Sequence, residues 1–360
     1  MPGKTLTAPT KPVYLKATGI VTAVGLNSEQ TATAVRAGIS GYDDSSIYNK
    51  RFNPITMALL PEDSLPPLAD EINEKVPGLT SRQIRMIRLA HLALDDLQSK
   101  FNPLDSLPLF LAGPETLMEQ VKPCYPELIE HIAIQTGITF HPEHSTIMPR
   151  GRAGGIWALH YAMAYVQAGY SQYAIVGGVD SYLDLYLLGS LDMEDRILAE
   201  GMMDAFAAGE GAGFFVISSQ PEPFEDSGKN ILIYPPGLAK EEGHRYSQEI
   251  YRGDGLADAV TIALDNANLP PIQTVHASLN GENFGAKELG VATTRNSDRL
   301  DPEYKIMHPS DCLGDIGAAY FPVSVALIAK VFLNDYIASP VLDYASSETE
   351  FRAATCVAMS

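Results

Sequence analysis

Two adjacent stretches decide the fold: Gly151-Arg-Ala-Gly-Gly-Ile-Trp-Ala-Leu-His-Tyr-Ala-Met-Ala-Tyr-Val-Gln-Ala168 and Tyr173-Ala-Ile-Val-Gly-Gly-Val-Asp-Ser181. The first has small or apolar residues on nearly every face, which is typical of a helix that is buried on all sides. The second is an apolar run that ends in a tight glycine turn, as expected of a buried strand. A fully buried helix followed by a buried strand indicates an α/β protein.

Strands and helices alternate on both sides of these stretches. Residues 13–25 alternate like a strand, residues 81–100 keep an apolar helical stripe, and residues 107–112 resemble a buried parallel strand. Toward the C-terminus, a second βαβ series is expected with elements near 231, 256–267, 275–279 and 316–331.

The polar segment 220–229 contains two prolines and predicts a linker. It divides the chain into an N-terminal half at 13–219 and a C-terminal half at 230–360.

Composition limits the classes of partner. The chain has 360 residues, of which 46% are hydrophobic, so it can bury a large core. Its net charge of −19 repels nucleic-acid phosphates and anionic membranes. The three cysteines share no CxxC spacing, which fits a reducing cytoplasm, and no stretch has the length and uniform apolarity of a membrane span. We therefore expect a cytoplasmic protein that binds neither nucleic acid nor membrane.

Five glycine-rich motifs follow one another in a characteristic order: Thr18-Gly-Ile-Val-Thr-Ala-Val-Gly25, Ala37-Gly-Ile-Ser-Gly41, Gly177-Gly-Val-Asp-Ser181, Gly209-Glu-Gly-Ala-Gly213 and Leu313-Gly-Asp-Ile-Gly-Ala318. Together they resemble the landmarks of the β-ketoacyl synthases, although each motif alone is a weak signal. The resemblance implies the thiolase fold, with two βαβαββ halves in a five-layered αβαβα core. It also implies a homodimer or heterodimer in which the strand near residues 174–177 pairs across the interface.

The same resemblance locates the positions where the family carries its catalytic residues. A condensing enzyme places a cysteine thiolate at a helix N-terminus, which lowers the thiol pKa and supplies an oxyanion site. The matching position here holds Arg152. The two histidines of the family match Asn280 and Asp311, and a one-residue slip would place Cys312 or Ser310 at the second position. All three catalytic positions are therefore degenerate.

The Phe- and Gly-rich turn that lines the acyl pocket in the family is replaced by Ser346-Ser-Glu-Thr-Glu-Phe-Arg-Ala353. Since an arginine at a helix N-terminus needs a counter-charge, we expect Arg152 to pair with Asp311. Asn280 would accept a hydrogen bond from the guanidinium and donate one to the carboxylate. The alternative is that Arg152 points to solvent or binds an anionic ligand.

Secondary candidates are few. Cys312 with His308 four residues before it could form a relocated nucleophile and base, although a small semi-buried residue is the simpler interpretation of Cys312. His141 and His144 flank Glu143 in a proline-bounded loop that is more typical of solvated residues than of metal ligands. The sequence predicts no cofactor and no metal.

Two functions follow from the degenerate positions. The first is a catalytically inactive binding, scaffold or adaptor protein for a partner, such as a synthase subunit or a bacterial secretion-system cargo. Chain length factors, which resemble inactive synthases, are the precedent. The second is an acyltransferase of the 3-oxoacyl-ACP synthase type, which would act on acyl-CoA or an acyl carrier protein by an altered mechanism in fatty-acid or polyketide metabolism. The second function requires an open tunnel beside Arg152.

Overall fold

The computed structural model describes residues 6–117 and 122–360. Within this part of the chain, no helix has both the length and the apolar character needed to cross a bilayer. The strands are β1 (Val13–Thr22), β2 (Asp43–Tyr48), β3 (Pro54–Ala58), β4 (Leu109–Gly113), β5 (Thr146–Pro149), β6 (Tyr173–Ser181), β7 (Ala208–Ser218), β8 (Ile231–Ile233), β9 (Gly237–Lys240), β10 (Ile272–Ala277), β11 (Leu300–Met307), β12 (Val341–Ser346) and β13 (Phe351–Met359). The helices are α1 (Ser28–Arg36), α2 (Asp70–Lys75), α3 (Ser81–Gln98), α4 (Leu128–Thr136), α5 (Gly154–Gln167), α6 (Leu185–Met193), α7 (Asp254–Ala267), α8 (Asn283–Arg295), α9 (Ser310–Leu313) and α10 (Tyr320–Leu333).

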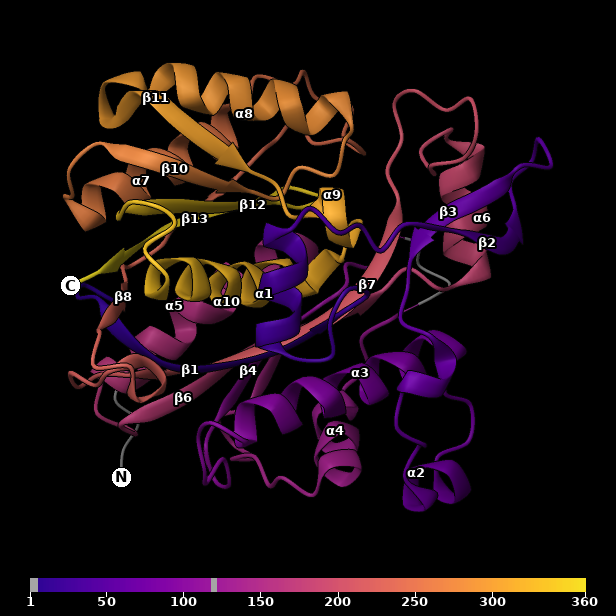
Figure 1. Ribbon diagram of the computed structural model, residues 1–360, viewed down its shortest axis with the longest axis horizontal. Helices are drawn as coiled ribbons and strands as arrows, with labels where there is room; N and C mark the ends of the chain where they lie inside the picture. Colours follow the sequence, from indigo (N-terminus) through magenta and orange to yellow (C-terminus); the bar gives the residue numbers. More distant parts are fainter. Residues whose placement is uncertain (1–5, 118–121) are drawn as a thin grey trace.

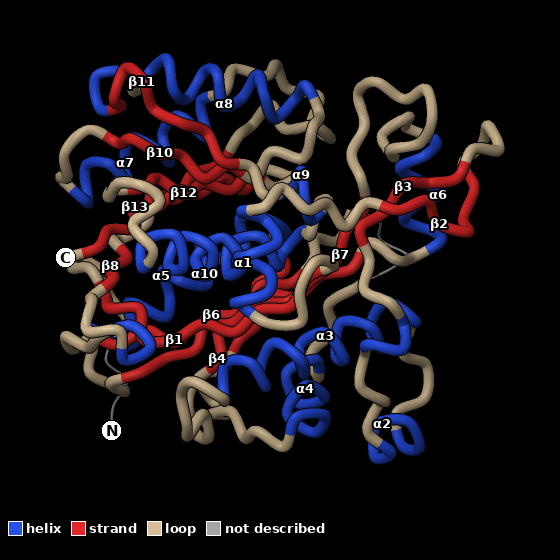
Figure 2. Tube along the Cα trace, viewed as in Figure 1, coloured by secondary structure: helices blue, strands red, loops and turns tan. Residues whose placement is uncertain are grey.

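These elements stack in five layers, as Figures 1 and 2 show. Helices α3 and α4 cover the outer face of one group of strands, and α7 and α8 cover the outer face of the other. Helices α5 and α10 form the middle layer and contact strands of both groups. Three clusters of buried apolar side chains fill the spaces between the layers. The expected αβαβα core is therefore confirmed.

The strand order reveals an internal duplication. The first group runs β1-β7-β6-β4-β5 and the second runs β8-β13-β12-β10-β11. In each group, the first two pairings are antiparallel and the last two are parallel. Each half is therefore βαβαβαββ, which is one βα unit more than the βαβαββ plan that we expected. Strands β1 and β8 pair antiparallel and join the two groups into one sheet.

Helix α5 is buried on nearly all sides, as its sequence predicts. Ten of its fourteen residues are buried. A Cβ added to Gly155 would lie 2.8 Å from the Cβ of Phe321, so α5 and α10 approach more closely than a larger side chain would allow. This close approach places the N-terminus of α5 at the boundary between the two halves.

The strand expected at a subunit interface is not at the edge of the sheet. Strand β6 contains residues 174–177, and it is hydrogen-bonded to β7 on one side and to β4 on the other. Our expectation of dimer pairing through this strand was therefore wrong, because β6 has no free edge to offer. Within the described residues, the outermost strand of the first group is β5, which pairs only with β4.

One part of the first half projects from the layered core (Figure 1, right). It consists of residues 43–58, which form the β2–β3 hairpin, and residues 182–206, which contain α6 and the segment after it. We call these residues the outer lobe. It has a small apolar cluster of its own, to which Met57, Leu188 and Phe206 contribute.

A buried carboxyl group in the second half, that of Asp343, has no cationic partner among the residues that the structure describes. Asp343 on β12 is fully buried, and the hydroxyl of Tyr320 donates to its Oδ1 at 3.0 Å. Burial raises the pKa of Asp343 to about 8, although hydrogen bonds from Ser324 and Tyr320 act in the opposite direction. Burial also lowers the pKa of His276, which is opposite Asp343 in register, to about 4. Both groups are therefore neutral near pH 7.

This site predicts a measurable pH dependence. The pKa of Asp343 is raised in the folded state above its unfolded value of about 3.9, so the folded state binds more protons between these values. Its contribution to stability is complete below about pH 4 and is lost progressively as the pH rises toward 8. We expect Asp343→Asn to remove this loss. Urea unfolding at pH 5 and pH 8.5 checks it, and an identical pH dependence in the wild type and the variant would contradict it.

Candidate functional site

Arg152 lies where the two halves meet, just before α5. It belongs to the 3₁₀ turn Gly151–Ala153, which leads directly into that helix. Gly151 has φ of 54°, and a Cβ added there would lie 2.5 Å from the carboxylate of Glu115, so the turn requires glycine. The Arg152 side chain is only 11% exposed. It therefore points into the protein. The structure does not support the alternative interpretation, in which Arg152 points to solvent.

The guanidinium of Arg152 binds three groups from the second half. Its Nε donates to the backbone carbonyl of Ser346 at 2.8 Å, its Nη2 donates to Glu348 Oε1 at 2.6 Å, and its Nη1 donates to Asp315 Oδ2. Burial alone would lower the pKa of Arg152, but Asp315 and Glu348 raise it well above its ordinary value. Arg152 is therefore a charged group that ties the first half to the second.

Further arginines extend this pairing. Arg196 forms a bidentate pair with Glu282 at 2.7 and 2.8 Å and lies 2.9 Å from Glu348. Arg245 lies 3.1 Å from Glu282 and 3.4 Å from Glu348. Burial alone would raise the pKa of Glu348, but Arg152, Arg196 and Arg245 lower it to about 2. We call the six side chains the arginine–carboxylate cluster: Arg152, Arg196, Arg245, Glu282, Asp315 and Glu348.

Asn280 belongs to the same site. Its Nδ2 donates to Asp315 Oδ2 at 2.9 Å and to Glu282 Oε2 at 3.0 Å. We expected Asn280 to bridge the guanidinium and a carboxylate. The structure instead has it bridging two carboxylates, which an amide donor with two N–H groups can do.

Asp311 does not pair with Arg152, so this expectation was wrong. Its side chain is 72% exposed, and Oδ2 lies 2.9 Å from Nδ1 of His308. The short helix α9 directs Asp311 outward and is followed by Gly314, whose φ of 67° turns the chain. After this turn, Asp315 is directed inward and is almost fully buried. The counter-charge of Arg152 is therefore Asp315, four residues after Asp311.

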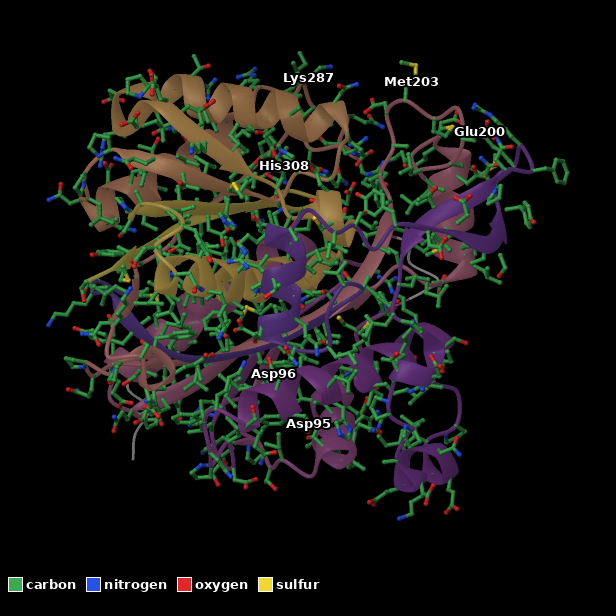
Figure 3. All side chains as sticks on the ribbon, in the orientation of Figure 1. Asp95, Asp96, Glu200, Met203, Lys287 and His308 are labelled. Carbon is green, nitrogen blue, oxygen red and sulfur yellow. The ribbon has the colours of Figure 1, made fainter. Side chains whose placement is uncertain are left out.

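Cys312 and His308 do not have the features of a relocated nucleophile and base. Burial raises the pKa of the Cys312 thiol, and Asp311 raises it further, which disfavours the thiolate. The imidazole of His308 contacts Asp311, and Figure 3 shows His308 on the segment that leads into α9. The structure supports the simpler interpretation of Cys312 as a small buried residue.

The loop at residues 346–353 is fixed against the first half. Glu115 accepts hydrogen bonds from the backbone N–H of Glu348 at 2.9 Å, and from the backbone N–H and hydroxyl of Thr349. Burial raises the pKa of Glu115. The backbone N–H of Ala153 also donates to Ser347 Oγ at 3.0 Å. These contacts hold Glu348 in place for Arg152.

Several members of this site were absent from the sequence prediction, namely Glu115, Arg196, Arg245, Glu282, Asp315 and Glu348. Two of them could have been predicted as partners of Arg152, because a buried arginine requires carboxylates. Glu348 lies in an acidic segment, and Asp315 is the aspartate of the glycine-rich motif at 313–318. Arg196 and Arg245 lie in irregular segments and carry no local signature.

Little free space remains beside Arg152. Three cavities border it among the described residues, with volumes of about 30, 20 and 10 Å³. A water molecule needs roughly 10–15 Å³, so even the largest of the three cavities holds no more than about three waters. Among the described residues, none of these three cavities is the open tunnel that acyl transfer beside Arg152 requires.

Breaking the cluster should destabilise the fold. We expect Arg152→Ala and Asp315→Ala each to lower the free energy of unfolding by about 3–5 kcal/mol, because each leaves a buried charge without its partner. The double variant should lose less than the sum, since the two residues interact directly. Chemical unfolding of the three variants measures this coupling.

The matched control is Asp311→Ala, which removes an exposed carboxylate from the same segment. It should change the free energy of unfolding by less than about 0.5 kcal/mol. Losses from Arg152→Ala and Asp315→Ala that are small and additive would show that the two residues do not interact.

Comparison with known proteins identifies the fold. No protein-family model matches the chain, and no curated protein matches it. Among solved structures, the ketosynthase ApeO in complex with its chain length factor ApeC from Xenorhabdus doucetiae matches with a TM-score of 0.77 and 13% identity, over 97% of this chain and 98% of that chain. The ishigamide ketosynthase/chain length factor matches with a TM-score of 0.72 and 17% identity, over 97% and 99% of the two chains.

A β-ketoacyl synthase from Burkholderia phymatum STM815 matches with a TM-score of 0.70 and 15% identity, over 97% of this chain and 100% of that chain. At such identities the likeness shows the fold alone. The chain therefore has the thiolase-like fold of β-ketoacyl synthases and chain length factors over nearly its full length.

Proposed function

We propose that the protein is a catalytically silent ketosynthase-like protein that serves as a binding or scaffold partner of another protein. One observation carries the proposal: the arginine–carboxylate cluster fills the position that the sequence resemblance matches to the condensing cysteine. A guanidinium held by two carboxylates cannot accept an acyl group, because acyl transfer needs a nucleophile such as a thiolate. The three cavities that border Arg152 in the described part of the chain are also too small for an acyl chain.

The similar structures favour one kind of partner protein. Two of the similar structures contain a ketosynthase together with a chain length factor. By analogy, a synthase subunit is the partner that we favour. A role as an adaptor for secretion cargo, which the sequence also left open, has no observation in its support.

The free edge of β5 is the surface that we propose for subunit association. Within the described residues, β5 pairs only with β4, so one row of its backbone N–H and C=O groups remains available to another chain. A groove of about 760 Å³ lies beside it, lined by residues that include Ile129, Ile134 and Phe140. A second groove of about 440 Å³, lined in part by Tyr161, lies on its other side. Apolar grooves on both sides of an open strand fit edge-to-edge pairing.

A charge on this edge should prevent association. Thr146 is exposed on β5, so Thr146→Lys places a cation at the proposed interface without disturbing the core. We expect the wild type to sediment as a dimer at micromolar concentration and the variant to sediment as a monomer. Thr294→Lys, the same substitution at an exposed position of α8, should remain dimeric. A wild-type monomer that also fails to bind a synthase subunit would contradict the proposal.

The absence of acyl transfer can be tested by mass spectrometry. We expect no stable acyl adduct after incubation with a long-chain acyl-CoA or with cerulenin, while an active condensing enzyme treated in parallel is labelled. Cys312→Ser serves to locate any adduct that forms. An adduct that disappears in Cys312→Ser, or one that reacts onward with a malonyl thioester, would overturn the proposal.

A further inference from the structure

The outer lobe exposes an unusual amount of apolar surface. Four of the five most exposed large apolar side chains among the described residues lie in it: Met203 at 98%, Phe52 at 85%, Leu185 at 73% and Met193 at 71%. Figure 3 shows Met203 at the outer end of the segment that follows α6. Scattered exposed apolar residues are normal in proteins, whereas their concentration in one projecting part is typical of an interaction surface.

Hydrogen bonds hold the parts of the lobe together. The backbone N–H of Lys50 in the hairpin donates to Asp192 Oδ2 at 2.6 Å, and Asn53 Nδ2 donates to the carbonyl of Glu200 at 3.2 Å. The backbone N–H of Thr56 donates to the carbonyl of Leu198 at 2.9 Å. The hairpin, the end of α6 and the following segment are therefore one unit. These bonds fix the segments that carry the exposed apolar side chains relative to one another, which lowers the entropy cost of binding.

The lobe also has an acidic surface. Its exposed ionisable residues are two cations, Lys50 and Arg51, and six carboxylates: Asp43, Asp44, Glu194, Asp195, Glu200 and Asp204. Both cations lie about 3 Å from the single carboxylate of Asp195, at 3.0 and 2.9 Å. The other carboxylates therefore give the lobe an excess of negative charge beside its apolar side chains.

We propose that the outer lobe docks a basic, amphipathic segment of a partner protein. Apolar side chains of that segment would pack on Phe52, Met193 and Met203, and its lysines and arginines would lie near the lobe carboxylates. Methionine suits this role because its side chain adapts to differently shaped partners. A second copy of this chain does not fit, because it would bring the same acidic lobe against this one. The proposal does not depend on the catalytic state of the Arg152 site.

The probe is a short, fluorescent amphipathic helical peptide made of leucine and lysine, titrated by anisotropy at near-physiological salt. The double variant Phe52→Ser/Met203→Ser should bind it about tenfold more weakly, because two buried anchors are lost. Asp44→Asn/Glu200→Gln should weaken binding and reduce its salt dependence. Thermal melts check that these exposed substitutions leave the fold intact.

The matched control is Ile250→Ser, which removes a side chain that is 77% exposed outside the lobe. It should leave the affinity unchanged. Equal affinity of the wild type, the lobe variants and the control would mean that the peptide responds only to the overall charge of −19, and the proposal would be wrong. Loss of self-association in the Phe52→Ser/Met203→Ser variant would also overturn it, because a second copy would then be the occupant.

Discussion

The buried guanidinium of Arg152 is the constraint on which the centre of this structure depends. An arginine at the start of α5 meets the positive end of the helix dipole, and its burial removes water as a source of compensation. Carboxylates must therefore surround it. The second half supplies Asp315 from the turn after α9 and Glu348 from the loop between β12 and β13. Glu115 then fixes that loop through its backbone N–H groups. Each contact joins the two halves, so the site also holds them together.

Much of the fold could be predicted from the sequence, because its signals are local. The buried character of α5 follows from its small and apolar residues, and the glycine motifs carry the family resemblance that implied the five-layered fold. The duplication was implied only by the family resemblance, since the halves share strand order but no evident sequence repeat. The free edge of the sheet was also assigned to the wrong strand. Apolar composition shows that β6 is buried, but whether a strand has one neighbour or two depends on pairings between distant segments.

The site was predicted less completely than the fold, for a related reason. The need of Arg152 for a counter-charge is a local electrostatic argument, and it was correct in kind. The identity of the partner depends on side-chain direction, which the left-handed turn at Gly314 reverses between Asp311 and Asp315. Glu348 and Arg196 come from irregular segments far along the chain, where neither spacing nor periodicity indicates a contact. Our two proposals rest on the small cavities beside Arg152 and on the exposed apolar and acidic side chains of the outer lobe.

The most direct test of this account is a crystal structure determined after soaking with a long-chain acyl-CoA. The account predicts that the guanidinium of Arg152 stays hydrogen-bonded to Asp315 and Glu348, and that no acyl chain enters beside α5. Electron density for an acyl chain next to Arg152, with the loop that carries Glu348 displaced, would contradict it. In that case the arginine–carboxylate cluster would be a movable gate to an acyl-binding site, and it would not block that site permanently.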